Sequence, residues 1–341
     1  MEAVSIQDVD GLLESVSSQP RPRRCVSVVI VTYYTGPLLW RSIAAALAQD
    51  EVAEVIVVDN GNWDRTREEL TRMTAEDARI RLLTGHGNVG FAAGCNMGAQ
   101  IAKGRFLFVL NPDAILPRGA VAALLSEGLK HGGTGHWMAG GRLLNVDGTE
   151  QAGARRGPLT PWTALVEMTK LYTVAPKHPY FRRFNNHCEP CPGETVDMPV
   201  ISGACMLMPT SAYEAVRGMD ESFFLHVEDV DFCLRFRSGG GRVLYAPGVE
   251  VVHFKSSSRA NRIRIERLKS ESMIRYFKRH FSGVYPVGFL TLVSILIYMG
   301  FCARALHILG GRISAVAGMN GRVGRSRAGR AVRLSRRAAL R

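Results

Sequence analysis

The sequence has no acidic residue after Glu271. Thirteen of its 43 lysines and arginines lie beyond that point, so residues 1–271 carry 30 basic and 30 acidic side chains. The formal net charge of +13 therefore belongs to the C-terminal end of the chain. A folded part with balanced charge gives no electrostatic reason to bind polyanions, and we predict no nucleic-acid partner.

The N-terminus lacks an apolar run, and the cysteines lack a regular pattern. Residues 1–24 have no hydrophobic signal core, so we predict an N-terminal extension there without secretory targeting. Seven scattered cysteines favour reduced thiols over a disulfide framework. Cys188-x-x-Cys191 has no second pair, so free structural cysteines are favoured over a zinc site.

Short apolar, β-branched runs alternate with helix-like stretches in the first part of the chain. The runs occupy residues 26–33, 54–59, 80–83 and 106–110, and helical patterns occur at 38–49 and after Gly94. Nearly continuous apolar runs are typical of strands covered on both faces. Their alternation with helices predicts an α/β nucleotide-binding domain with a central, mostly parallel sheet.

Polar residues stand where these predicted strands end. Ligands of such sheets bind beyond the carboxyl ends of the strands. Asp59 is either a contact for a ribose or base N–H or a residue of an Asp-Asn-Gly turn. Asp113 follows Pro112, which ends its strand, and is either a turn residue or a cation ligand. A hard divalent cation on a diphosphate needs one or two protein carboxylates.

Residues 150–199 contain seven prolines and no regular pattern. We predict a mobile insertion beside the site, in contact with an acceptor. Strand-like runs resume at 200–209 and 241–254.

An acidic cluster begins the predicted helix after the apolar Phe223–Leu225. Glu228, Asp229 and Asp231 fall in or near its first turn, where acids complement the helix dipole. A carboxylate beside an apolar wall is also poised to accept a proton. His253 ends a later strand-like run and gains significance if it shares a cleft with Asp113.

The loop Gly85-x-Gly87-x-x-Gly90 has the spacing of a dinucleotide fingerprint, which suggests a nicotinamide-dependent oxidoreductase. That fingerprint follows the first strand of its domain, whereas this loop follows the third predicted strand. We therefore interpret the match as accidental, with glycines that let the backbone turn tightly.

Six blocks, taken in order, resemble the family-two glycosyltransferases of GT-A fold, and most of all their rhamnosyltransferase and cell-surface polysaccharide branch. The blocks are VSVVIVTY, VIVVDN, GNVGFAAGCNMG, LNPD, FFLHVEDVDFCLR and VVHFKSSS, from Val26 to Ser258. The resemblance implies a GT-A domain over residues 25–258. It also implies transfer of a sugar, with rhamnose as the expected one, from a dTDP- or UDP-sugar to a hydroxyl of a glycan or lipid-linked acceptor.

The resemblance further implies roles for single residues. Asp229 would be the catalytic base of an inverting displacement, and Asp113 and His253 would hold Mg²⁺ or Mn²⁺. The nucleotide and sugar contacts would be Thr32, Asp59, Asn88, Gly90, Asn96 and Glu228. Two positions depart from the family: many relatives have Asp where this chain has Asn111, and often Asn where it has Tyr34.

The C-terminal part suggests a membrane surface. Residues 281–303 carry no formal charge and are long enough to span, but both flanks are basic, which the positive-inside tendency disfavours for one span. Pro286, Gly288 and Gly300 argue against a straight helix. We predict a basic helix at 259–280, an in-plane or re-entrant segment at 281–303, and an Arg-rich tail at 304–341 on anionic lipid at the cytoplasmic face. A buried core helix, or a non-catalytic membrane scaffold of this fold, are the alternatives.

Overall fold

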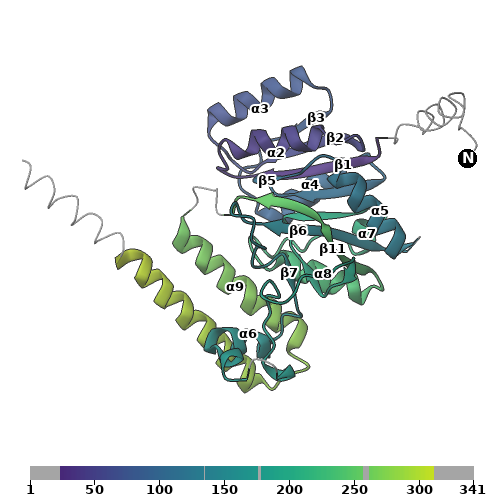
Figure 1. The fold of residues 1–341 in the computed structure, drawn as a ribbon. Helices are drawn as coiled ribbons and strands as arrows, with labels where there is room; N and C mark the ends of the chain where they lie inside the picture. Colours follow the sequence, from purple (N-terminus) through teal and green to yellow (C-terminus); the bar gives the residue numbers. More distant parts are fainter. Residues whose placement is uncertain (1–23, 134, 176–177, 256–260, 311–341) are drawn as a thin grey trace, which may run out of the picture. The chain divides into compact units, whose positions relative to one another are not determined.

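The computed structural model describes residues 24–133, 135–175, 178–255 and 261–310 (Figure 1). The chain forms two compact units. Of the described residues, the first unit holds those before Leu159 and those within Phe184–Phe224 and Glu228–Arg259. The second unit holds those within Leu159–Arg183 and Leu225–Val227 and those after Ala260. Residues 1–23 of the predicted extension and 311–341 of the predicted tail lie outside the described residues. The predicted insertion at 150–199 divides between the units.

The first unit is built on a sheet that has nine strands within the described residues, in the order β3-β2-β1-β4-β10-β6-β11-β5 with β8 beside β11; a small second sheet pairs β7 with β9. The predicted runs become strands with nearly the expected bounds. The strands are β1 Val26–Thr32, β2 Val52–Asp59, β3 Ile80–Leu83, β4 Phe106–Leu110, β5 Ala114–Ile115, β6 Trp137–Leu144, β7 Arg155–Arg156, β8 Val196–Asp197, β9 Val200–Ile201, β10 Cys205–Pro209 and β11 Arg242–His253.

Helices cover both faces of this sheet, as the apolar strands require. The helices of the unit are α2 Leu38–Leu47, α3 Asp64–Glu76, α4 Phe91–Ile101, α5 Ala120–Gly132, α7 Thr210–Ala215 and α8 Glu228–Ser238. In β1, Val28 and Ile30 belong to the same core cluster as Leu39 of α2. On the other face α4 approaches closely at Gly98, where a Cβ would stand 2.5 Å from a methyl of Val29.

The polarity of the sheet changes at β4, and this change gathers the polar strand ends. β4 runs parallel to β1 but antiparallel to β10, with Cys205 opposite Leu110. The residues before β10 therefore lie at the same edge as the residues after β4. β11 pairs antiparallel with β5, with His253 opposite Ala114, which brings His253 to that edge as well.

The second unit is helical within its described residues. It contains α6 Pro161–Thr169, two short 3₁₀ turns at Leu171–Thr173 and Pro179–Phe181, and α9 Arg262–Phe281. Thr160 caps α6 through a capping box, and Asn261 caps α9. A further apolar helix, Val287–Gly310, starts directly after Pro286. Gly288 and Gly300 lie inside this helix without ending it.

Candidate active site

Asp113 and His253 lie in contact. His253 Nε2 is 3.0 Å from Asp113 Oδ1 and 3.1 Å from Asn111 Nδ2, and the Asp113 and His253 residues are buried. The Phe254 N–H donates to the Asp113 carbonyl, so the loop after β4 and the end of β11 are also joined through the backbone. Two residues that are 140 positions apart in the sequence thus share one edge of the sheet.

Asp229 lies in the first turn of α8. Its Oδ2 accepts hydrogen bonds from Arg156 Nη2 at 2.5 Å and from the Gly203 N–H at 3.1 Å, and its Oδ1 accepts from the Val230 N–H at 2.8 Å. These donors hold the carboxylate in one orientation and compensate its charge. Ile201 contributes by accepting a second bond from Arg156 Nη2 through its carbonyl.

One backbone contact links this carboxylate to the Asp113–His253 pair. The Asn111 N–H donates to the Ala204 carbonyl at 3.0 Å, while the preceding residue, Gly203, binds Asp229. The side chain of Asn111 reaches His253. The three predicted catalytic and metal-binding side chains therefore belong to one continuous set of contacts, which sequence positions alone do not reveal.

The two acids near Asp229 in the sequence, Glu228 and Asp231, have different surroundings. Burial, and then the Asp229 charge, raise the pKa of Glu228 to about 8, and its buried Oε2 has no hydrogen-bond partner. Asp231 is fully buried and binds Arg235 at 2.7 Å, one turn along the helix. Because His226 and Val227 both have positive φ, at 65° and 71°, the helix is entered through a strained connection.

Asp59 has the surroundings of a turn residue. Its Oδ1 accepts from the Gly61 N–H and from the backbone and side chain of Asn62, and its Oδ2 accepts from Thr84 and Arg67. Burial opposes its ionisation, but these hydrogen bonds outweigh burial and lower the pKa of Asp59. Thr32 is joined to the same turn, because its carbonyl accepts from Asn60 and Asn62.

Three predicted contacts of the sugar nucleotide, Asn88, Gly90 and Asn96, also interact with residues of the loops beside α4. Asn88 Oδ1 accepts from the Gly90 N–H. At Gly90, with φ at 93°, a Cβ would stand 2.6 Å from the Phe224 carbonyl oxygen, so this glycine permits a close backbone approach. Asn96 binds Met219 through both of its polar atoms and also contacts Tyr213 and Glu221.

The structure adds residues that the sequence did not suggest. Arg156 reaches Asp229 because β7 pairs with β9, a pairing of two residues each that has no sequence signature. Gln151 Oε1 is 2.6 Å from His253 Nδ1. Both residues lie in the stretch predicted as a mobile insertion, where neither periodicity nor the family resemblance marks them.

The seven cysteine side chains are thiols and form no disulfide with one another. Cys188 and Cys191 are exposed thiols, and no group of three or more His, Cys, Asp or Glu that could hold a metal occurs in the described ranges. Burial raises the pKa of Cys205 to about 11 and that of Cys233 to about 12. Cys302 is exposed on the helix Val287–Gly310.

Comparison with known proteins agrees with this arrangement. Residues 27–141 match the family described as Glycosyl transferase family 2. The chain is 29% identical over 246 residues to the N-acetylglucosaminyl-diphospho-decaprenol L-rhamnosyltransferase of Mycobacterium tuberculosis, covering 68% of this chain and 76% of that protein. It is 26% identical over 206 residues to a low-salt glycan biosynthesis hexosyltransferase of Haloferax volcanii, covering 59% of each.

Two solved structures share the fold. The crystal structure of GalNAc-T7 with UDP, GalNAc and Mn²⁺ has a TM-score of 0.57 at 17% identity and covers 74% of this chain. This chain spans about half of that protein, 48% of its length. The mannosyltransferase PcManGT of Pyrobaculum calidifontis, with GDP-Man and Mn²⁺, has a TM-score of 0.50 at 15% identity and covers 85% of this chain and 75% of that one.

The motifs, the sheet that brings their ends together and these similarities agree. The chain has the GT-A fold, matches Glycosyl transferase family 2 over residues 27–141, and resembles the rhamnosyltransferases in sequence.

Proposed function

We propose that this glycosyltransferase transfers a sugar, with rhamnose as the first candidate, from a nucleoside-diphosphate sugar to a hydroxyl of a lipid-linked acceptor, in a metal-dependent reaction that inverts the anomeric centre. The Mycobacterium tuberculosis relative is named for rhamnose transfer to a diphospho-decaprenol acceptor. The continuous contacts from Asp229 through Gly203 and Asn111 to His253 carry the proposal, because a base and a diphosphate-binding edge must flank one sugar.

Asp229 acts as the general base in this proposal. The acceptor oxygen attacks the anomeric carbon as its proton passes to a carboxylate oxygen of Asp229, and the bond from that carbon to the diphosphate oxygen breaks with its electron pair. Glu228, whose pKa is about 8, keeps its proton at neutral pH, so the neighbouring pair carries one negative charge. Arg156 then holds that charge on Asp229.

The residues present fit a divalent cation. Asp113 and His253 supply one carboxylate oxygen and one imidazole nitrogen at a shared point, and the phosphates and water complete the coordination of such cations. A bound Mg²⁺ or Mn²⁺ would offset the negative charge of the departing diphosphate. Asn111 in place of an aspartate leaves the site with fewer carboxylates, so we expect weak cation binding until the donor adds its phosphates.

The second unit supports a location at a membrane surface. The helix Val287–Gly310 is long and apolar enough to cross a membrane, with a mean hydropathy of 1.9 over its most apolar stretch and 11% of that stretch buried. A core helix would be mostly buried, so the helix does not have that character. Leu290, Val293 and Ile297 face inward, while an outward stripe stays exposed: Leu292, Ile295, Met299, Cys302, Leu306 and Leu309.

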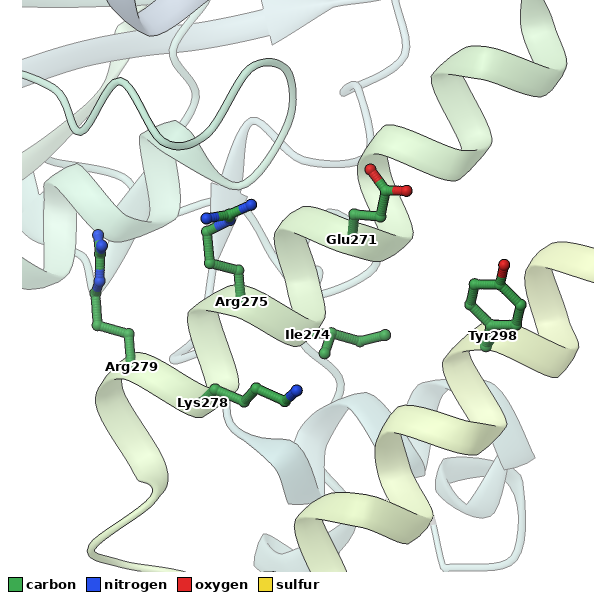
Figure 2. A pocket seen from close by; sticks show the side chains of 6 residues that line it. All are labelled: Glu271, Ile274, Arg275, Lys278, Arg279 and Tyr298. Atoms are coloured by element: carbon green, nitrogen blue, oxygen red, sulfur yellow. The ribbon is translucent and has the colours of Figure 1, made fainter.

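The neighbouring helix α9 supplies positive charge. Its sequence contains seven Lys and Arg against two Glu, and one of these acids, Glu266, is paired with Arg304. A hollow of about 570 Å³ is lined by residues of α9 and of the apolar helix, among them Arg275, Lys278, Arg279 and Tyr298. Figure 2 shows how these side chains lie. A basic face beside an exposed apolar stripe suits an interface with anionic lipids, and we propose in-plane binding at the cytoplasmic face.

Substitution of the proposed base tests the mechanism. Asp229→Asn keeps the shape of the side chain but cannot take up the proton, so we expect transfer to fall by about 10²–10⁴-fold. Binding of UDP or dTDP, followed by calorimetry, should stay within about threefold. Release of nucleoside diphosphate from a panel of sugar nucleotides measures activity and identifies the donor. Unchanged turnover in Asp229→Asn would reject the assigned base.

The same measurement separates the alternatives. A non-catalytic scaffold would release no diphosphate from any donor with or without Mn²⁺. The hypothesis of a nicotinamide enzyme has no support, because the glycine loop of this chain follows β3 and Gly90 lets the backbone approach Phe224 closely.

A further inference from the structure

A tight turn after β6 lies next to the proposed cation site. The Gly148 N–H donates to the Asn145 carbonyl, the Asn145 N–H donates to the Thr149 carbonyl, and Gly148 has φ at 81°. The returning chain places Gln151 against His253, where its N–H binds the Leu143 carbonyl. Gln151 is buried, whereas Asp147 and Thr149 are exposed at the tip of the turn.

Side chains of this turn form a continuous chain of hydrogen bonds. Thr149 Oγ1 donates to Asp147 Oδ1 at 2.6 Å, and Asn145 Nδ2 donates to Thr149 Oγ1 at 3.0 Å. Gln151 Nε2 donates to Asn145 Oδ1 at 3.1 Å and to the His253 carbonyl at 3.1 Å. Gln151 Oε1 then lies 2.6 Å from His253 Nδ1.

The direction of every bond follows from the carboxylate at one end. Bonds from Thr149 lower the pKa of Asp147, so it is ionised at neutral pH and can accept but not donate. The threonine hydrogen is therefore used on Asp147, and Thr149 Oγ1 must accept from an amide N–H of Asn145. Asn145 consequently presents its oxygen to Gln151, and Gln151 presents its own oxygen to His253.

We infer that Gln151, oriented by this chain, is a positioning residue that keeps a hydrogen on Nδ1 of His253 and turns Nε2 toward Asp113 as the metal-binding nitrogen. An acceptor at 2.6 Å from Nδ1 requires an N–H there. Nε2 faces Asp113 Oδ1 at 3.0 Å, where a lone pair would meet a carboxylate oxygen unless a proton or a cation lies between them. Hydrogen bonding of the second imidazole nitrogen is a known means of fixing a metal-binding histidine.

The inference rests on the proposed cation site, but the position of the hydrogen on the His253 ring can be measured without a metal. In protein labelled with ¹⁵N-histidine and free of metal, the His253 signals, assigned with His253→Gln, should show a hydrogen on Nδ1. Gln151→Leu removes the acceptor, and we expect a population with the hydrogen on Nε2 alone to appear. A parent protein that already carries its hydrogen on Nε2 alone would overturn the inference.

Cation binding gives the second readout. Titration of Mn²⁺ by electron paramagnetic resonance, without sugar nucleotide, should show about 10–100-fold weaker binding for Gln151→Leu, as for other partners of metal-binding histidines. Thr149→Val removes the hydroxyl at the exposed end of the hydrogen-bond chain. It should weaken Mn²⁺ binding by about fivefold, the effect of one neutral hydrogen bond. Thr149→Ser keeps the hydroxyl and should restore binding, while Thr71→Val on α3 is the matched exposed control.

The two readouts separate this inference from the proposed function. Equal Mn²⁺ affinity in the parent, Gln151→Leu and Thr149→Val, all folded by circular dichroism, would refute the positioning role. If the parent binds no Mn²⁺ even with UDP added, the proposed cation site fails. A hydrogen on Nδ1 that is lost in Gln151→Leu would still establish the hydrogen-bond chain in that case.

Discussion

At the scale of single residues, Arg156 is a charged partner of the proposed base. Its guanidinium holds Asp229 in place beside a second carboxyl group, Glu228, and the side chains of Arg156 and Asp229 are 12% and 14% exposed. Removing one member of such a pair leaves the other charge without compensation. Arg156 is therefore expected to matter for the rate more than for binding of the donor.

We expect Arg156→Gln to lower kcat by about tenfold or more, a part of the contribution of a general base. The dissociation constant of UDP or dTDP should change little, and Arg156→Lys should recover part of the rate because it restores a cation. Steady-state kinetics and calorimetry on the three proteins measure both quantities. Full activity of Arg156→Gln would show that Asp229 needs no positively charged side chain beside it.

Glu228 predicts a dependence of stability on pH. Its pKa is about 8 in the folded protein against 4.5 for the free side chain, so between these values the folded state holds a proton that the unfolded state has released. The free energy of unfolding therefore falls as pH rises from 4.5 to 8 and levels off above 8. Each pKa unit corresponds to about 1.4 kcal/mol, so the total is a few kcal/mol.

Glu228→Gln removes this titration and should make the protein more stable than the parent at pH 8, with little difference near pH 5. Thermal unfolding at a series of pH values measures the effect, and Glu68→Gln, exposed on α3, is the control. Parallel curves for the parent and Glu228→Gln would contradict a protonated, buried Glu228.

The sequence predicts single residues only where a motif marks them. Asp113, Asp229 and His253 follow from six ordered blocks, and the structure places them in one set of contacts. Arg156 and Gln151 could not be found, because each acts through a pairing set by tertiary structure: β7 with β9, and the turn after β6 with β11. The predicted nucleotide contacts Asp59 and Asn96 have polar atoms that bind neighbours within the fold, which the motifs did not indicate.

At the scale of elements, the glycine loop before α4 supports the segment that leads into α8. The Phe91 N–H binds the Phe224 carbonyl at 2.9 Å, and Asn60 binds the Gly90 carbonyl. A methyl group at Gly90 would collide with a backbone atom, whereas Gly85 and Gly87 face open space.

We therefore expect Gly90→Ala to destabilise the protein by about 2 kcal/mol or more, from the collision together with the positive φ. Gly85→Ala and Gly87→Ala should each cost about 1–2 kcal/mol from the backbone conformation alone. Thermal unfolding measures all three. In a dinucleotide loop, which needs its first two glycines for the turn and the pyrophosphate, Gly85→Ala and Gly87→Ala would instead be more harmful than Gly90→Ala.

The elements themselves were largely predictable. The predicted strands at 80–83 and 106–110 match β3 and β4, and the run at 54–59 lies within β2, because buried strands need continuous apolar residues. The run at 200–209 is divided into β9 and β10 by the loop that holds Gly203. The antiparallel direction of β10 was not predictable, since it depends on which strand its edge meets.

At the scale of the whole molecule, the outward stripe of the helix Val287–Gly310 predicts how the protein meets a membrane. Ile295→Ser with Met299→Ser removes exposed apolar surface without disturbing packing. Each of these side chains would contribute about 2 kcal/mol to membrane binding when the bilayer buries it. We expect the double variant to bind phosphatidylglycerol vesicles at least about a hundredfold more weakly, measured by co-sedimentation. Val146→Ser, at an exposed position in the first unit, is the control.

Two further measurements decide the mode of binding. Arg275→Gln with Lys278→Gln should weaken binding to anionic vesicles by about fivefold for each residue and leave binding to phosphatidylcholine unchanged. Alkaline carbonate should extract the protein from membranes if the helix lies in the plane. Retention after carbonate treatment would instead indicate a spanning helix.

Cys302 gives the molecule a built-in reporter of immersion depth. Thiolate is the form that alkylating reagents attack, and the buried Cys205 and Cys233 scarcely ionise near neutrality. With the half-buried Cys25 and the exposed Cys188 and Cys191 changed to serine, a polarity-sensitive dye would attach chiefly to Cys302, on the outward side of the apolar helix. Its emission colour would then report, in real time, whether this helix enters the acyl chains and how its depth changes with lipid composition.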